Sequence, residues 1–278
     1  MPDVYGYLAR IDLADPGAPS VEGLRALHRA QVERVAYENL DIQLGRPPSI
    51  DPVASFQRIV AGRGGYCFHL NGAFSLLLSA LGYTVRWHRG GVQGREDIDP
   101  VGATGNHLAL TVHNLPDADN PEGVWFVDVG LGDALHEPLP LRAGTHEDGV
   151  LVFSLAPSLS EPGGWRLEHD AGGSFTGMDF RSDVAGVADF AAQHQWLSTS
   201  PDSGFVKLAV VQRRHALGSD VLRGRVLTLA SGESRELTSA DEWYAALGDL
   251  FGLDLPVDDR EALWRRVSLA HQVWLASR

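Results

Sequence analysis

One cysteine, one histidine and one aspartate have the types and the order that nucleophilic catalysis on an acyl group requires. Cys67 is the only cysteine of the chain, and it follows Gly64-Gly65-Tyr66 at the start of a predicted helix. The N-terminus of a helix stabilises a thiolate, because it carries the positive end of the helix dipole and unpaired N–H groups. His107 is the candidate base for the thiol proton, and Asp128 is the candidate carboxylate that orients the imidazole.

The spacing of His107 and Asp128 supports their pairing. Two strand-like segments flank the polar stretch 116–123, which is typical of a hairpin connection. Opposed residues of an antiparallel pair have a constant sum of residue numbers, and His107 with Asp128 gives the same sum as His113 with Glu122. We therefore expect the two side chains opposite or nearly opposite each other on one face. A one-residue slip in register would separate them.

Each of the three residues also has a purely structural interpretation. A lone cysteine is often a small buried residue, and a strand histidine can serve only a hydrogen bond in the core. This interpretation is weakest for Asp128, because its neighbours Val127 and Val129 are apolar and a carboxylate among them needs a specific partner. The other histidines lack the paired spacing of a zinc site, so we expect no metal.

The periodicity of apolar residues predicts helices in roughly the first eighty residues. A helix with an N-cap serine is expected over 20–35, and a shorter one over 50–60. The helix that begins at Cys67 is the clearest, because its apolar side chains fall on one face and Gly82 follows as a C-cap. The segment 39–48 is expected to be a loop.

Beyond Tyr83 the pattern changes to strands separated by Gly, Pro, Asn and Asp. The expected strands of this middle section are 83–87, 107–115, 124–131, 150–155 and 165–169, with a loop or weak hairpin over 156–173. Two further strands are expected over 205–212 and 221–229. The end of the chain is expected to be helical, with a capping box formed by Ser239 and Glu242 and an amphipathic segment over 260–276.

The composition is that of an ordinary globular protein. The chain has 278 residues, of which 44% are hydrophobic and 21% charged, and its formal net charge is -13. This negative charge and the lack of a long Lys/Arg run argue against a nucleic-acid-binding protein. We expect no signal peptide and no membrane-spanning segment. A single cysteine fits a reducing compartment, so we expect a cytoplasmic protein.

Five ordered segments resemble the motifs of the arylamine N-acetyltransferase family. They are Tyr7–Ile11, Val35–Asp41, Arg63–Asn71 around the cysteine, Asn106–Leu110 around the histidine and Val127–Gly132 around the aspartate. A further likeness over 198–205 and the segment after it extends the resemblance through most of the chain. Five motifs in order are a far more specific signal than a Gly-Gly-x-Cys sequence alone.

The resemblance implies an α+β multi-domain fold with a cysteine-protease-like triad. Its parts are an N-terminal helical bundle over 1–85, a central antiparallel β-barrel over 86–195 and a C-terminal α/β lid over 196–278. It also implies that Cys67 takes an acetyl group from acetyl-CoA as a thioester and passes it, in a ping-pong reaction, to an arylamine, a hydrazine or an N-hydroxyarylamine. We expect no nucleic-acid or membrane partner, and a monomer or a homodimer.

The same matching assigns residues to substrate binding. Tyr37, Phe68 and Leu131 are expected to line the acceptor pocket, where aromatic walls can stack on a flat amine; the alternative is that Tyr37 and Phe68 are core aromatics. Gly132 is expected to admit the pantetheine arm of CoA, and Thr104 and Gly105 are weaker candidates for CoA contact. The acidic chain offers few partners for the CoA phosphates, and the candidates are Lys207, Arg213 and Arg214.

One position departs from the family's pattern. The family usually has an acidic residue two positions after the cysteine, whereas this chain has His69. An imidazole in that place, neutral or cationic, changes the charge beside the nucleophile. Two outcomes are open at this point: further stabilisation of the thiolate, or an altered set of hydrogen bonds between the domains.

Two other functions compete with acetyl transfer to an arylamine. An amide synthase of secondary metabolism with the same fold would take a longer acyl chain from a carrier protein. A cysteine hydrolase of papain or transglutaminase type would use the same order of Cys, His and Asp, and would pass the acyl group to water instead of an amine. The whole-chain resemblance favours the acetyltransferase.

Overall fold

The computed structural model describes residues 2–276, and its first part is helical. The helices are α1 (Val4–Arg10), α2 (Val21–Arg34), α3 (Leu40–Gln43), α4 (Pro52–Val60) and α5 (Cys67–Ala80). The expected N-cap of α2 is confirmed, because Ser20 Oγ accepts a hydrogen bond from Gly23 N–H at 3.0 Å. The expected loop over 39–48 was wrong in part, since α3 lies within it.

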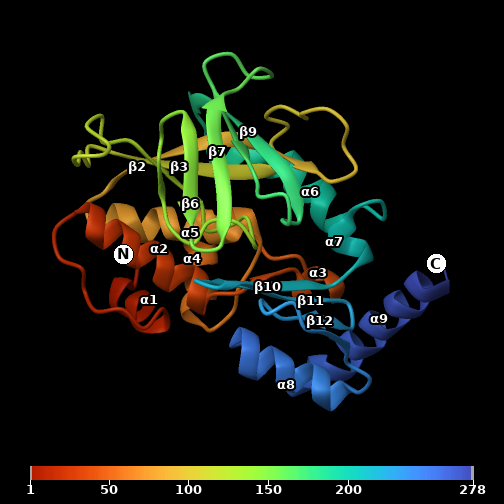
Figure 1. Cartoon of the computed structure of the whole chain (residues 1–278). Helices are drawn as coiled ribbons and strands as arrows, with labels where there is room; N and C mark the ends of the chain where they lie inside the picture. The colour runs from red at the N-terminus through yellow and green to blue at the C-terminus, as the bar shows by residue number, and fades with distance from the viewer. Residues whose placement is uncertain (1, 277–278) are drawn as a thin grey trace.

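The middle of the chain forms an eight-stranded antiparallel sheet that curls into a nearly closed barrel above the N-terminal helices (Figure 1). In sheet order the strands are β5 (Leu139–Pro140), β4 (Trp125–Val127), β3 (His107–His113), β2 (Thr84–Gly94), β9 (Phe175–Val184), β8 (Trp165–Glu168), β7 (Leu151–Pro157) and β6 (Gly144–Asp148). The strand expected to end at Trp87 continues to Gly94, and β9 was not predicted at all.

The last part of the chain contains a second sheet covered by helices. Its elements are η1 (Val187–Phe190), α6 (Ala191–Thr199), α7 (Gly204–Lys207), β10 (Val210–His215), β11 (Gly218–Arg223), β12 (Val226–Thr228), β13 (Ser234–Glu236), α8 (Ala240–Phe251) and α9 (Val257–Ala276). The strand expected over 205–212 begins only at Val210, because α7 precedes it. The strand expected over 221–229 is two strands joined by a turn at Gly224, whose φ is 59°. The capping box of Ser239 and Glu242 at the start of α8 is confirmed.

The second sheet also recruits a strand from the N-terminal part of the chain. Its order is β1-β10-β11-β12-β13, where β1 (Tyr37–Glu38) pairs antiparallel with β10, so that Tyr37 lies opposite Gln212. Ala36 and Leu40, which flank β1, belong to the same buried cluster as Trp243 of α8. The site described below therefore lies where the helices, the barrel and the second sheet meet.

The architecture confirms the α+β fold expected from the sequence. One buried cluster joins α1, α2, α4 and α5 to β3 and β4, a second fills the inside of the barrel, and a third lies between the second sheet and α8 and α9. The domain boundaries near 85 and 195 stay a prediction. No helix within residues 2–276 is long and apolar enough to span a membrane.

Candidate active site

Cys67 is the first residue of α5, as the sequence predicted, and it is only 4% exposed. Its Sγ lies 3.7 Å from the backbone oxygen of Asn106. The Asn106 side chain is itself fixed, because it accepts a hydrogen bond from Val92 N–H at 2.8 Å and donates one to Val92 O at 3.2 Å. The thiol therefore sits between the start of α5 and the segment that leads into β3.

His107 and Asp128 meet on the barrel face that covers α5. His107 Nε2 lies 2.6 Å from Asp128 Oδ2, and both side chains are almost completely buried. Asp128 Oδ1 accepts two further hydrogen bonds, from Asn71 Nδ2 at 2.8 Å and from Gly130 N–H at 2.9 Å. Three donor atoms thus hold the carboxylate in one orientation.

The predicted register of the hairpin was wrong by two residues. Leu110 pairs with Val127 and Val112 with Trp125, so His107 is diagonal to Asp128 and not opposite it. Side chains alternate between the two faces of a strand, and a slip of two residues keeps them on the same face. The two side chains are therefore in contact, as predicted, although the predicted register was wrong.

The charge of His107 is set by its two neighbours. Burial alone would lower the pKa of His107, but the charge of Asp128, the charge of a Cys67 thiolate and hydrogen bonds to both groups outweigh burial and raise this pKa to about 10. Because Asp128 occupies Nε2, the remaining nitrogen, Nδ1, is the one available to Cys67. The arrangement favours a thiolate–imidazolium pair at neutral pH.

Asn71 joins the three segments of the site. It lies one turn after Cys67 on α5, it is completely buried, and its Nδ2 donates to Leu108 O at 2.7 Å as well as to Asp128. Its Oδ1 accepts a hydrogen bond from Val129 N–H at 2.9 Å. This side chain ties the nucleophile helix to both strands that carry the pair, and its only signal in the sequence is its place at the end of the motif around Cys67.

Replacing Asn71 with alanine should lower kcat about 100-fold, because it frees Asp128 and both strands to shift relative to Cys67. We also expect a loss of about 2 kcal/mol in the free energy of unfolding, since buried partners lose their hydrogen bonds. Steady-state kinetics and urea unfolding measure both effects. Ser75→Ala is the matched control: Ser75 is buried on the same helix and bonds only Gly72 O. Equal losses in the two variants would contradict a positioning role for Asn71.

His69 lies on the side of α5 away from the cavity at Cys67. It is fully buried, its Nδ1 accepts a hydrogen bond from Tyr66 N–H at 3.4 Å, and its Nε2 donates to Pro48 O at 3.4 Å. Burial, helped by the nearby charge of Arg58, lowers the pKa of His69 to about 3. The imidazole is therefore neutral, which removes the alternative of a cation that stabilises the thiolate. It acts instead as a polar cap on the first turn of α5.

A cavity of about 260 Å³ opens next to the Cys67 thiol and His107. Its other walls come from the barrel, from α6 and α7 and from the second sheet, and they are Tyr37, Val92, Gly94, Asn106, Gly130, Leu131, Ser174, Phe175, Leu197, Phe205 and Gln212. Two of the three predicted acceptor contacts, Tyr37 and Leu131, are among them. Phe68 is not: its ring packs against Tyr66 and Phe190 with centroids 5.6 and 5.3 Å away, so it is a core aromatic.

Comparison with known proteins identifies the family. A protein-family model described as N-acetyltransferase matches residues 20–260. An arylamine N-acetyltransferase from Mycolicibacterium smegmatis is 32% identical over 91% of this chain and 92% of its own length. The chain belongs to the arylamine N-acetyltransferase family.

Further relatives agree with this assignment. The arylamine N-acetyltransferase / N-hydroxyarylamine O-acetyltransferase of Salmonella typhimurium is 35% identical, in an alignment that spans about half of each chain, 50% of this one and 48% of the relative. The structure of Mycobacterium marinum arylamine N-acetyltransferase in complex with CoA superimposes with a TM-score of 0.84 at 28% identity, over 96% of this chain and 99% of that one. The protein is an acetyltransferase by family.

The glycines and threonine matched to CoA in this family do not line the cavity. Gly132 has a φ of 68°, and a Cβ there would lie 2.1 Å from Gln212 Oε1, so the close approach that requires glycine is to the protein itself. Thr104 O accepts a hydrogen bond from Arg89 Nη2 at 2.7 Å, and Gly105 N–H donates to Gly90 O at 2.8 Å.

Of the three cations suggested for the CoA phosphates, Arg214 is unsuitable. It is 2% exposed, and its guanidinium donates to Ala134 O at 2.7 Å and to Asp148 O at 3.2 Å. This suggestion was wrong, because a cation held in the core by carbonyl oxygens cannot reach a phosphate in solvent. Lys207 is exposed and lies 3.9 Å from Asp202, and Arg213 is half-buried.

Several cavity residues could not be found by reading the sequence. Leu197 and Phe205 lie in α6 and α7, which were not predicted, and Gln212 reaches the site through the pairing of β10 with β1. Val92 lies in the part of β2 that extends beyond the predicted strand. Asn106 carried a usable signal, because it precedes the histidine within the family motif. Within residues 2–276, no three His, Cys, Asp or Glu side chains are grouped as they would be around a metal ion.

Proposed function

We propose that this protein moves an acetyl group from acetyl-CoA to a small arylamine, hydrazine or N-hydroxyarylamine through a thioester on Cys67. The observation that carries the proposal is the buried His107–Asp128 pair beside a lone thiol that opens into a cavity. Membership of the family and the CoA complex of a relative support acetyl-CoA as the donor. His107 is the base, Asp128 orients it, and Tyr37 and Leu131 contact the acceptor.

The first half-reaction forms the thioester. Proton transfer from Cys67 to His107 yields the thiolate–imidazolium pair, and the thiolate attacks the acetyl carbonyl carbon. The N-terminal end of α5, where Cys67 lies, can stabilise the negative oxygen of the tetrahedral intermediate through its backbone N–H groups and its dipole. The C–S bond to CoA then breaks, and the CoA thiolate leaves with the imidazolium proton.

The second half-reaction returns the enzyme to its starting state. The acceptor nitrogen attacks the thioester carbonyl and gives its proton to His107, and the C–S bond to Cys67 breaks as the amide forms. Tyr37 and Phe205, whose rings meet edge to face with centroids 6.3 Å apart, provide an aromatic wall for the acceptor. A cavity of about 260 Å³ is small for a drug-sized ligand, which favours acceptors with a single ring.

Intact-mass measurement after mixing with acetyl-CoA tests this function. We expect an acetyl adduct that persists without acceptor, disappears when aniline is added and does not form on Cys67→Ser under the same conditions. An adduct that forms only from a longer, carrier-bound acyl thioester would establish the amide synthase instead. Loss of the adduct in buffer as fast as with aniline would establish a hydrolase.

The raised pKa of His107 predicts an unusual pH profile for the thiol. An ordinary cysteine, with a pKa near ~8.5, is almost unreactive toward iodoacetamide at about pH 6. Here the imidazolium keeps its proton until the pH approaches about 10, and a cation beside the sulfur favours the thiolate. We expect alkylation of Cys67 to change less than about threefold between about pH 6 and pH 9. A rise of about tenfold per pH unit over that range would contradict the pair.

We further propose that the protein is cytoplasmic and that it is a monomer or a homodimer. A cytoplasmic location rests on the single cysteine, and a monomer or a homodimer on the family. Size-exclusion chromatography with light scattering decides between the two assembly states.

A further inference from the structure

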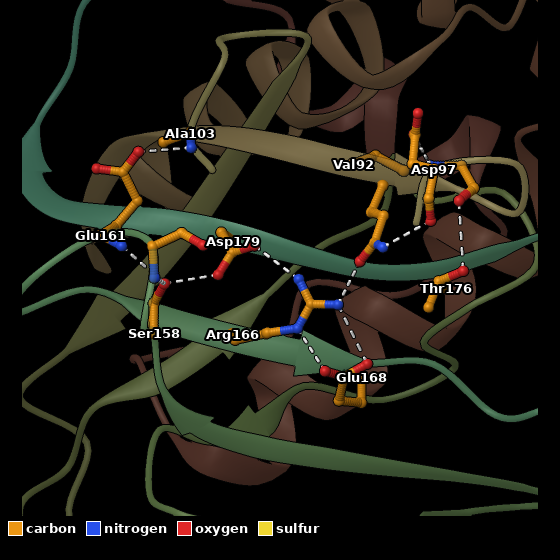
Figure 2. Close-up of polar contacts among 12 residues, drawn as sticks. Val92, Asp97, Ala103, Ser158, Glu161, Arg166, Glu168, Thr176 and Asp179 are labelled. Carbon is orange, nitrogen blue, oxygen red and sulfur yellow. Dashed lines mark hydrogen bonds and ion pairs between the residues drawn. The ribbon is translucent and has the colours of Figure 1, made fainter. Parts of the chain in front are cut away.

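A buried polar chain in the barrel begins and ends beside the active site. Its members are Gln93 of β2, Arg166 of β8, Asp179 of β9, and Ser158 and Glu161 of the loop between β7 and β8 (Figure 2). At one end, Gln93 lies between two residues that line the cavity. At the other end, Glu161 holds the segment that leads into His107.

The links of the chain are short hydrogen bonds and one ion pair. Arg166 donates to Gln93 Oε1 at 2.5 Å and to Asp179 Oδ2 at 2.6 Å. Asp179 Oδ1 accepts from Ser158 Oγ at 2.6 Å, and Ser158 Oγ in turn accepts from Glu161 N–H at 3.0 Å. Asp179 is completely buried, so its charge needs this partner. The Nε of Arg166 also donates a hydrogen bond to Glu168 Oε1.

Glu161 connects this chain of hydrogen bonds to the segment that precedes His107. Its Oε1 accepts a hydrogen bond from Ala103 N–H at 2.7 Å, and its Oε2 accepts one from Arg181 at 2.8 Å. Its side chain is only 14% exposed, and the hydrogen bond from Arg181 holds its pKa below the usual range, so it is a carboxylate at neutral pH. Ala103 lies four residues before His107, at the start of a segment that ends at the Asn106 oxygen beside the Cys67 thiol.

We propose that Glu161 is a positioning residue for acyl transfer: it anchors Ala103, and with it the segment that sets His107 and the Asn106 carbonyl against Cys67. The chain through Ser158, Asp179 and Arg166 holds Glu161 in place and connects it to Gln93 of β2. A buried ion pair often stabilises a core less than well-packed apolar side chains of similar volume do. Its presence here therefore favours a role in fixing the geometry of the site. The inference rests on the proposed use of Cys67 as nucleophile.

Alkylation of the single cysteine measures this role without any acyl donor. The rate of reaction of Cys67 with iodoacetamide, followed by intact mass from about pH 5 to about pH 9, reports how well His107 holds the thiolate. We expect Glu161→Ala to lower this rate about tenfold at about pH 6 and to shift the acid limb of the profile upward, since small displacements near a reacting pair have large kinetic effects. The kcat of acetyl transfer should fall by a similar factor.

Glu161→Gln separates position from charge. Its amide oxygen can still accept from Ala103 N–H, and the lost ion pair is with the half-exposed Arg181, which contributes little. We expect this variant to keep an alkylation rate within about threefold of the wild type. Ser158→Ala, which removes the support of Glu161, should shift the profile in the same direction as Glu161→Ala. Its result decides the question if Glu161→Ala does not yield folded protein.

Arg225→Met is the matched control, because Arg225 is a similarly buried cation paired with Glu236 at 3.0 Å in the second sheet. It should lose stability and keep the wild-type alkylation profile. An unchanged profile in folded Glu161→Ala or Ser158→Ala would overturn the proposal and leave the chain a purely structural role. Failure of acetyl-CoA to label the wild type would refute the proposed function alone, since alkylation does not depend on the donor.

Discussion

Replacing Asp128 with asparagine should lower kcat about 10⁴-fold while the protein stays folded. Asp128 Oδ1 already accepts hydrogen bonds from Asn71 and Gly130 N–H, so the oxygen of the new amide will remain there. Its NH₂ group will then face His107 Nε2 and force that nitrogen to be an acceptor. The ring proton moves to Nδ1, which faces Cys67, and the neutral imidazole can no longer take the thiol proton.

Single-turnover acetylation and alkylation of Cys67 measure this loss. Asp220→Asn is the matched control, because Asp220 is a buried carboxylate of the second sheet that accepts from Ala230 N–H at 3.0 Å, a bond that an amide oxygen can keep. It should retain the wild-type rate. An Asp128→Asn enzyme within about tenfold of the wild type would show that the tautomer of His107 is not controlled by Asp128.

Gly130→Ala should lower kcat about 100-fold, although only one methyl group is added. A Cβ at Gly130 would lie 2.7 Å from Cys67 Cα and 2.9 Å from Asn71 Nδ2, both closer than van der Waals contact allows. The backbone after β4 must therefore move away from α5, and it takes Asp128 with it. The substitution should also destabilise the protein by about 1–3 kcal/mol.

Gly72→Ala tests whether any added methyl group near α5 has this effect. A Cβ at Gly72 would first meet Trp87 at 3.8 Å, which is ordinary contact, and alanine favours the helix. We expect wild-type activity and equal or higher thermal stability. Kinetics and thermal melts of the two variants provide the comparison. If Gly130→Ala were as active as Gly72→Ala, the close approach of the backbone after β4 to the nucleophile helix would be contradicted.

Local signals in the sequence were sufficient for the elements that begin with a cap or carry a regular apolar face. The N-cap at Ser20, the helix that starts at Cys67 and the capping box of α8 depend on residues within a few positions of one another, and all three are confirmed. The family motifs supplied the order of the remaining parts.

Elements held by distant partners could not be predicted in the same way. In β9, a buried aspartate, Asp179, breaks the expected alternation, and its contacts with Arg166 and Ser158 explain it. Near α7, the carbonyl of Phe205 is bound by Asn39 and Gln43, which lie more than 160 positions earlier in the chain. Helix and strand are decided there by tertiary hydrogen bonds, which outweigh local propensity.

In the candidate site, too, some features follow from the local sequence and others depend on distant partners. The face shared by His107 and Asp128 could be predicted, because the period of two along a strand tolerates a two-residue error. The cavity walls could not, because they come from segments that lie far apart in the sequence. Phe68, an aromatic beside the nucleophile, was expected to contact the acceptor and packs in the core instead.

The pairing of β1 with β10 also has a consequence for biosynthesis. Asn39 and Val210, which are joined by a hydrogen bond next to this pair, are 171 positions apart. As the ribosome releases the chain, the nucleophile helix and most of the barrel emerge long before β10 does. Until then the side of β1 that pairs with β10 is open, and the wall that contains Gln212 is missing. The acceptor cavity is therefore completed late in translation, so a nascent chain carries its cysteine without the pocket that makes it selective.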